Sequence, residues 1–131
     1  MEPDSFLRVV TLRRGKLKSV EFRLREGESG LSLFAATADI PPSAVLEAVR
    51  EAGKQGELAV ALVSGALLWR LGLHLVATPG GTPVAAVNAT HHEARLGRLR
   101  RLWLAVIRKP MHEYFNEAFS EAPAREARLL D

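Results

Sequence analysis

The sequence predicts a single α+β domain, with an antiparallel or mixed sheet of about five strands, helices packed on one face and two C-terminal helices. The chain has 131 residues, a usual length for one domain. Hydrophobic residues make up 47% and charged residues 25% of it, a balance typical of a folded globular chain. Short β-rich runs alternate with amphipathic segments. We therefore expect residues 1–131 to form one domain, with 121–131 as a frayed tail.

The first two strands are expected to form a hairpin. Residues 6–12 are rich in β-formers, and residues 17–25 alternate in period two, with Phe22 and Leu24 on one side. Gly15 lies in the connecting turn, where a positive φ is needed. One face of the hairpin should therefore pack on the core, and residues 31–34 should form a third strand beside it.

A helix should follow, with Asp39 as its N-cap and Pro41 and Pro42 in its first turn, where no amide donor is required. Its apolar face predicts that it covers the sheet, and Gly53 or Gly56 would end it.

The middle of the chain predicts two more strands around a short helix. Residues 58–63 form a continuous apolar run, which favours a central strand buried on both faces. Ser64 is placed to cap a short helix, and residues 73–77 form a strand that ends at the proline- and glycine-rich loop 78–83. Residues 89–95 are expected at an edge of the sheet.

A basic segment precedes Pro110, which should end or kink one helix before a second continues from Met111. Residues 95–109 contain six basic side chains and no acidic one. If the segment is helical, Leu99, Trp103, Val106 and Ile107 gather on one side, which we expect to be buried. The cations that would share the opposite, hydrated side are Arg95, Arg98, Arg101, Arg108 and Lys109.

This basic helix leads to the first functional hypothesis, a non-catalytic interaction module. Its cations would dock on an acidic protein or on nucleic acid, and a homodimer is also compatible with the pattern. An anionic membrane surface is a further alternative, with Trp103 at the interface. An ordinary hydrated face of a packed helix would show the same pattern.

The second hypothesis is a small metal-independent enzyme, a nuclease or nucleotide transferase of the kind found among toxins. The cluster His91, His92 and Glu93, together with Arg25, could supply an acid, a base and a cation. On a strand, His91, Glu93 and Arg95 would share one face. The alternative is that these are surface residues of an edge strand.

The same region allows two other interpretations. Arg23 or Arg25, a serine between residues 28 and 32, and Glu93 follow the order cation, hydroxyl, carboxylate, which would suit a diphosphate and a ribose. His91, Glu93 and His112 could instead hold zinc or another divalent ion. We expect no cofactor and no metal, because glycine-rich phosphate loops and metal-ligand spacings are absent from the sequence.

The compartment predicted is the cytoplasm. The chain has no cysteine, its first residues are acidic where a secretory leader is basic, and no apolar run is long enough to span a membrane.

Overall fold

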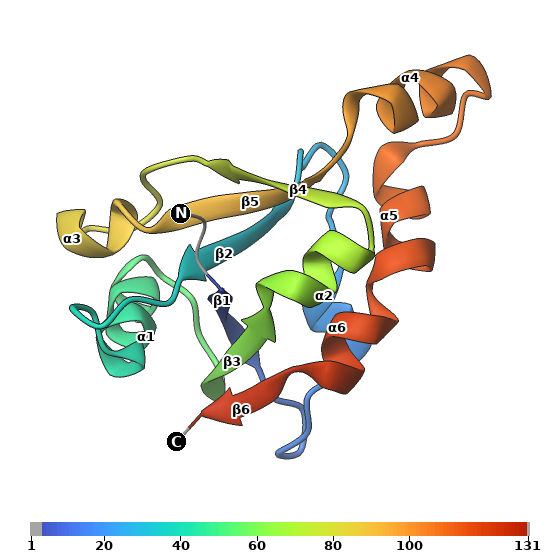
Figure 1. The fold of residues 1–131 in the computed structure, drawn as a ribbon. Helices are drawn as coiled ribbons and strands as arrows, with labels where there is room; N and C mark the ends of the chain where they lie inside the picture. The colour runs from blue at the N-terminus through green and yellow to red at the C-terminus, as the bar shows by residue number, and fades with distance from the viewer. Residues whose placement is uncertain (1–3, 131) are drawn as a thin grey trace.

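A computed structural model describes residues 4–130, which form one antiparallel sheet of six strands with helices on both faces (Figure 1). The strand order is β4-β5-β2-β1-β3-β6. The strands are β1 (Ser5–Thr11), β2 (Leu31–Ala35), β3 (Leu58–Ser64), β4 (Leu73–Ala77), β5 (His91–Leu96) and β6 (Arg128–Leu130). The helices are η1 (Ser19–Phe22, 3-10), α1 (Pro42–Glu51), α2 (Gly65–Arg70), α3 (Ala85–Asn88), α4 (Arg98–Val106), α5 (Met111–Phe119) and α6 (Glu121–Glu126).

Two hydrophobic layers lie on opposite faces of the sheet, because successive strand residues point to opposite sides. One face packs against α2 and α5, and its core contains Phe6, Leu33 and Phe115. The other packs against α1 and α3 around Leu7 and Phe34. The expectation that helices cover one face was therefore wrong, and Figure 1 shows α1 and α3 on the side away from α2, α5 and α6.

The predicted hairpin does not form, although Gly15 does adopt a positive φ of 75° and an isolated bridge joins Arg13 to Lys16. β1 has β3 on one side and β2 on the other, so both its edges are occupied. Residues 17–25 instead make the short helix η1 and an irregular segment that still buries Phe22 and Leu24. The alternating pattern thus indicated which side chains are buried, but it did not indicate strand pairing.

Four local predictions are confirmed. Ser64 caps α2, accepting a hydrogen bond from the amide of Leu67, and β4 has the expected bounds. The strand predicted at residues 31–34 is β2, and Pro110 separates α4 from α5.

Three details differ. Pro41, without a side-chain hydrogen bond, caps α1 in place of Asp39. β5 lies inside the sheet between β4 and β2, not at an edge. Within 121–130, the tail forms α6 and the edge strand β6, which pairs with β3.

None of the helices within residues 4–130 is long and apolar enough to cross a membrane.

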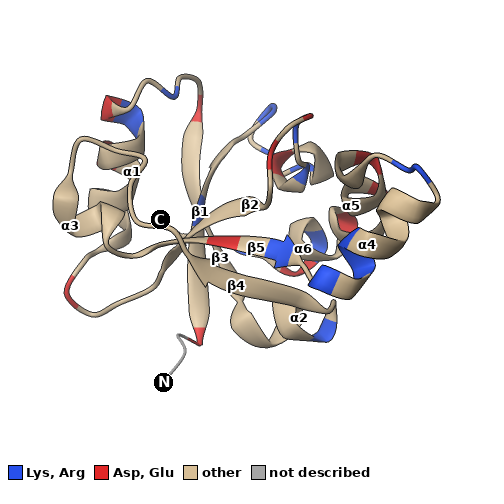
Figure 2. Ribbon diagram, turned by 90° about the horizontal axis from the view of Figure 1, so that it is seen from above, with Lys and Arg blue, Asp and Glu red and all other residues tan. Residues whose placement is uncertain are grey.

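The burial expected for the basic helix is also wrong. In α4 only Leu104 is buried, while Leu99 is 83% and Val106 79% exposed. α4 projects from the body of the fold, beyond the end of β5 (Figures 1 and 2).

The sheet is forked at its centre. β1 and β2 are matched only through Phe6 with Ala35 and Leu7 with Phe34, whereas β1 follows β3 over seven residue pairs. Beyond Leu7 the two strands diverge, and their edges no longer satisfy each other's backbone groups. Side chains must do so instead, and this requirement builds the candidate site.

Candidate functional site

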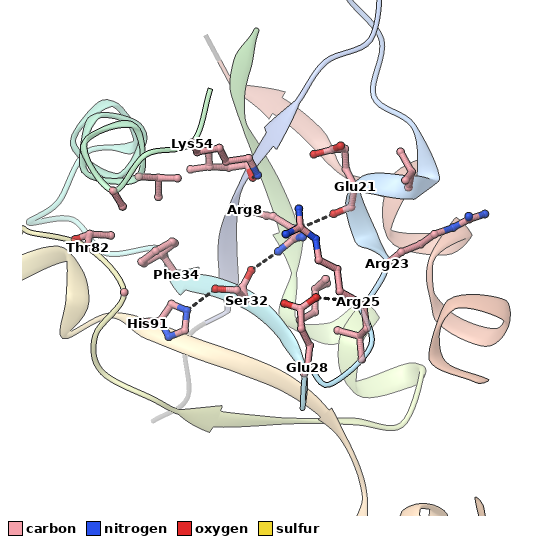
Figure 3. A pocket seen from close by; sticks show the side chains of 18 residues that line it. Arg8, Glu21, Arg23, Arg25, Glu28, Ser32, Phe34, Lys54, Thr82 and His91 are labelled. Carbon is pink, nitrogen blue, oxygen red and sulfur yellow. Dashed lines mark hydrogen bonds between the residues drawn. The ribbon is translucent and has the colours of Figure 1, made fainter. Parts of the chain in front are cut away.

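A cleft of about 310 Å³ lies in the fork between β1 and β2 (Figure 3). Its walls come from both strands, from η1 and the loop after it, from the end of α1, and from β5. Its polar lining includes Arg8, Arg25, Ser32, Lys54 and His91. Residues far apart in the chain thus meet in one concave place, as expected of a ligand site.

Arg8 and Lys54 hold the fork open by replacing the missing strand partners. Arg8 donates from Nη1 to the carbonyl oxygen of Ser32 on β2 (2.7 Å) and from Nε to that of Glu21 (2.6 Å). Lys54 donates from Nζ to the carbonyl oxygen of Val9 (2.9 Å). These carbonyls are satisfied, but a neutral acceptor does not pair with the charge of either cation; the carboxylate of Glu21 attracts both without forming an ion pair.

The positive charges of Arg8 and Lys54 are unfavourable in this cleft when no ligand is bound. Burial lowers the pKa of Arg8 to about 10, although Glu21 opposes the effect. Burial and the positive charge of Arg8 both lower the pKa of Lys54. Neither cation takes part in an ion pair within residues 4–130. An anion in the cleft would compensate both charges.

A serine and a histidine meet at the side of the cleft. Ser32 Oγ is in hydrogen-bond contact with Nε2 of His91, whose ring packs edge-on against Phe34. Nδ1 of His91 lies 2.7 Å from the carbonyl oxygen and 2.9 Å from the hydroxyl oxygen of Thr78. Because a carbonyl only accepts, these contacts favour the tautomer with the ring proton on Nδ1, in which Nε2 can accept a hydrogen bond from Ser32. The arrangement is that of a hydroxyl beside a positioned base.

β5 separates the predicted histidine cluster onto two faces. His92 points to the opposite side from His91: its ring contacts Phe6, and its Nδ1 is 2.8 Å from the Thr90 carbonyl oxygen. The structure therefore does not bring His92 together with His91, since neighbouring strand residues face opposite sides.

Glu93 lies beside the cleft and is already held by other side chains. Its Oε1 accepts from Arg95 Nε (2.8 Å) and from Ser29 Oγ (2.9 Å). Burial alone would raise the pKa of Glu93, but the hydrogen bonds from Arg95 and Ser29 outweigh it and lower the pKa. His91, Glu93 and Arg95 thus do share a face of β5, as predicted, but the chain itself satisfies Glu93.

Arg23 and Arg25 reach the cleft from the segment that was expected to be a strand. α5 fixes this segment: Asn116 Oδ1 accepts from the amide of Leu24 (2.6 Å), and Asn116 Nδ2 donates to its carbonyl oxygen (3.0 Å). Glu28 Oε1 in turn accepts from the amide of Arg25 (2.6 Å). Backbone bonds therefore anchor the segment while the guanidinium groups of Arg23 and Arg25 stay exposed.

The fold does not bring together the three residues suggested as metal ligands, His91, Glu93 and His112. His112 lies on α5 while His91 and Glu93 lie on β5. Within residues 4–130, no group of three or more potential ligands among histidine and acidic side chains is placed to hold a metal ion.

Sequence reasoning missed Arg8 and Lys54. Arg8 had a usable signal, because it is the one charged residue within the β-forming run 6–12. A charge flanked by buried strand positions needs a partner, and such a residue marks a candidate site. Lys54 had no such signal, since it follows α1 among polar residues.

The predicted partner-binding cations divide into two groups. Arg95 pairs with Glu93 at 2.6 Å and Lys109 with Glu117 at 2.7 Å, which raises the pKa of Lys109. Arg98, Arg101 and Arg108 are exposed and belong to none of the ion pairs found within residues 4–130.

Comparisons with protein-family models, with curated proteins and with solved structures find no match to this chain, so the site is interpreted from its own chemistry.

Proposed function

We propose that this chain is a metal-independent enzyme that binds a phosphate-bearing nucleotide in the cleft and transfers or cleaves a group with the Ser32–His91 pair. One observation carries the proposal: two cations without carboxylate partners line the same cleft as a hydroxyl with a positioned base.

The cations favour phosphate as the ligand chemistry. The guanidinium of Arg8 uses Nε and Nη1 for carbonyls, which leaves Nη2 for a ligand oxygen. Arg25 and Lys54 lie in the same lining, so a group with several anionic oxygens could contact all three. Glu21 and Glu28 also line the cleft, and suit the hydroxyl groups of a sugar.

The Ser32–His91 pair supports group transfer. His91 Nε2 is placed to take a proton from Ser32, or from a substrate hydroxyl or water that replaces it. The bond from Nδ1 to Thr78 fixes the tautomer and the ring plane that this step needs. Phe34 packs against the same ring and limits its rotation.

A binding experiment tests the ligand class. Calorimetry in EDTA buffer with pyrophosphate, AMP, ADP and NAD should show affinity for at least one compound with two linked phosphates. Lys54→Met and Arg25→Ala should each weaken it about tenfold or more, because a charge-assisted hydrogen bond is worth about 1.5–3 kcal/mol. Arg50→Ala, an exposed residue of α1 paired with Glu47, is the matched control. Equal affinity in all four proteins would refute the assignment.

A turnover experiment tests the chemistry. With the compound that binds best, products are followed by phosphorus NMR and mass spectrometry. His91→Asn and Ser32→Ala should retain binding but lose about a hundredfold or more of the rate, the scale of lost acid–base catalysis. Unchanged turnover in both variants would remove the catalytic role of the pair.

A further inference from the structure

Most of the apolar side of α4 does not face the body of the fold. The helix contacts the body through buried Leu104, through the edge-on contact of Trp103 with Tyr114, and through Arg100, whose guanidinium lies 5.8 Å from the ring centre of Phe119. The rest of the helix is exposed. The side that touches the fold therefore includes only one edge of the apolar side, at Trp103.

The apolar side chains form one continuous arc. At 100° per residue, Leu102, Val106, Leu99, Trp103 and Ile107 follow one another over about 140°. They are between 46% and 83% exposed. An apolar patch of this kind on a projecting element marks an interaction site.

The spacing within the arc is that of a helix that inserts into a groove. Leu99, Leu102, Trp103 and Val106 occupy positions i, i+3, i+4 and i+7, the anchor positions used by such helices. Arg98 borders one edge of the arc and Arg100 the other, while Arg101 lies on the far side. Figure 2 shows basic and no acidic residues on α4.

Arg108 lies directly beyond the helix. It follows the C-cap of α4 with a φ of 56°, a left-handed conformation in which glycine is favoured. An arginine there costs stability that a glycine would not. Arg14, in the turn after β1, has a similar φ of 54°, so this conformation does not by itself mark a binding residue.

These features distinguish between the occupants. Nucleic acid would satisfy the arginines but leave five large apolar side chains in water. A second copy of the chain, docked through the same helix, would bring arginines against arginines. A bilayer surface is flat, and would reach the apolar arc while leaving Arg101 on its far side. A concave protein surface contacts both.

We propose that α4 is a docking helix that inserts into an apolar groove of a partner protein whose rim carries aspartate and glutamate. The arc of Leu99, Leu102, Trp103 and Val106 fills the groove, and Arg98, Arg101 and Arg108 pair with its acidic rim. This role is separate from the cleft, which α4 does not line.

The test begins with tagged full-length chain expressed in the organism that encodes it. Wild type is compared with Leu102→Asp, with the pair Arg98→Glu and Arg101→Glu, and with a control pair of equal charge change, Arg13→Glu and Arg14→Glu, in the exposed turn after β1. The proposal requires a protein that co-purifies with wild type and control and is lost from both α4 variants. That protein is then identified by mass spectrometry, purified and titrated against each form.

With the purified partner, the α4 variants should raise the Kd about tenfold or more and the control pair less than about threefold. The reason is that anchor residues and paired charges dominate such interfaces. Added salt should weaken the wild-type complex. Arg108→Gly should raise Tm while weakening Kd. The inference is overturned if no protein meets the co-purification criterion, if the arginine pair proves dispensable, or if wild type instead self-associates or binds phosphatidylglycerol vesicles through α4.

Discussion

Replacement of Arg8 by methionine separates the demands of the fold from those of the ligand. Methionine keeps an unbranched apolar stem beside Phe22, over whose ring the Arg8 guanidinium lies at 5.8 Å. It removes the two hydrogen bonds to the carbonyl oxygens of Glu21 and Ser32. It also removes the buried positive charge.

The two effects on stability oppose each other. Each carbonyl left without a donor costs about 1–3 kcal/mol if water does not reach it. Burial lowers the pKa of Arg8 from its usual value to about 10, which corresponds to about 3 kcal/mol of unfavourable burial that the methionine variant no longer bears. The free energy of unfolding at pH 7 should therefore fall by no more than about 3 kcal/mol.

The assay combines urea unfolding with calorimetric titration of the best phosphate ligand. We expect Arg8→Met to stay folded, with a modest shift in midpoint, and to lose about tenfold or more in affinity. Phe22→Ala, which empties a fully buried site in the same region, provides the contrast and should cost about 3–5 kcal/mol.

Two results would refute this reasoning. If Arg8→Met unfolds as readily as Phe22→Ala, the guanidinium is needed for the stability of the fold and its buried charge does not indicate a ligand. If the variant is folded and binds phosphate as well as wild type, Arg8 does not contact the anion.

Three further predictions concern neighbouring features. Glu93→Gln should lower the free energy of unfolding by about 1–2 kcal/mol at pH 7. A carboxyl with a lowered pKa stabilises the fold while it is ionised, so the difference between variant and wild type must shrink as the pH falls through that pKa. A difference that does not change with pH would contradict the ion pair with Arg95. Gly30→Ala should lower Tm, because its Cβ would lie 2.8 Å from the Ala94 carbonyl oxygen, and an unchanged melting curve would show that β5 yields freely. Leu104→Ala should speed amide exchange throughout α4 while leaving β1 protected. Exchange in α4 at the wild-type rate would show that other contacts hold the helix.

The sequence predicted the sheet elements where local patterns were unambiguous. β4 and the short helix after Ser64 were readable because each is bounded by a clear cap or by a proline- and glycine-rich loop. The strand over 17–25 was wrong, because Phe22 and Leu24 are buried by α5 and α6 and not by strand pairing. Periodicity records which side chains are hidden, and several backbone conformations can hide the same ones.

The candidate site was only partly predictable for a related reason. His91 and Arg25 were identified from their chemistry, and both line the cleft. Arg8 had a local signal as the one charge in its β-forming run, but its meeting with Lys54 depends on the fork, and so on how many residues β1 shares with β2. Strand order and the length of each pairing are tertiary properties, and no local pattern encodes them.

The fork also divides the sheet mechanically. The ladder β4-β5-β2 and the ladder β1-β3-β6 meet at two residue pairs, whereas β1 and β3 are locked by seven. Rotation of one group of strands against the other would act on that short joint and on the hydrogen bond from Arg8 to the carbonyl oxygen of Ser32, which crosses the fork. The hydrophobic cores on both faces also contain residues from both groups, so a ligand that widened the opening would have to repack side chains there as well as strain the joint.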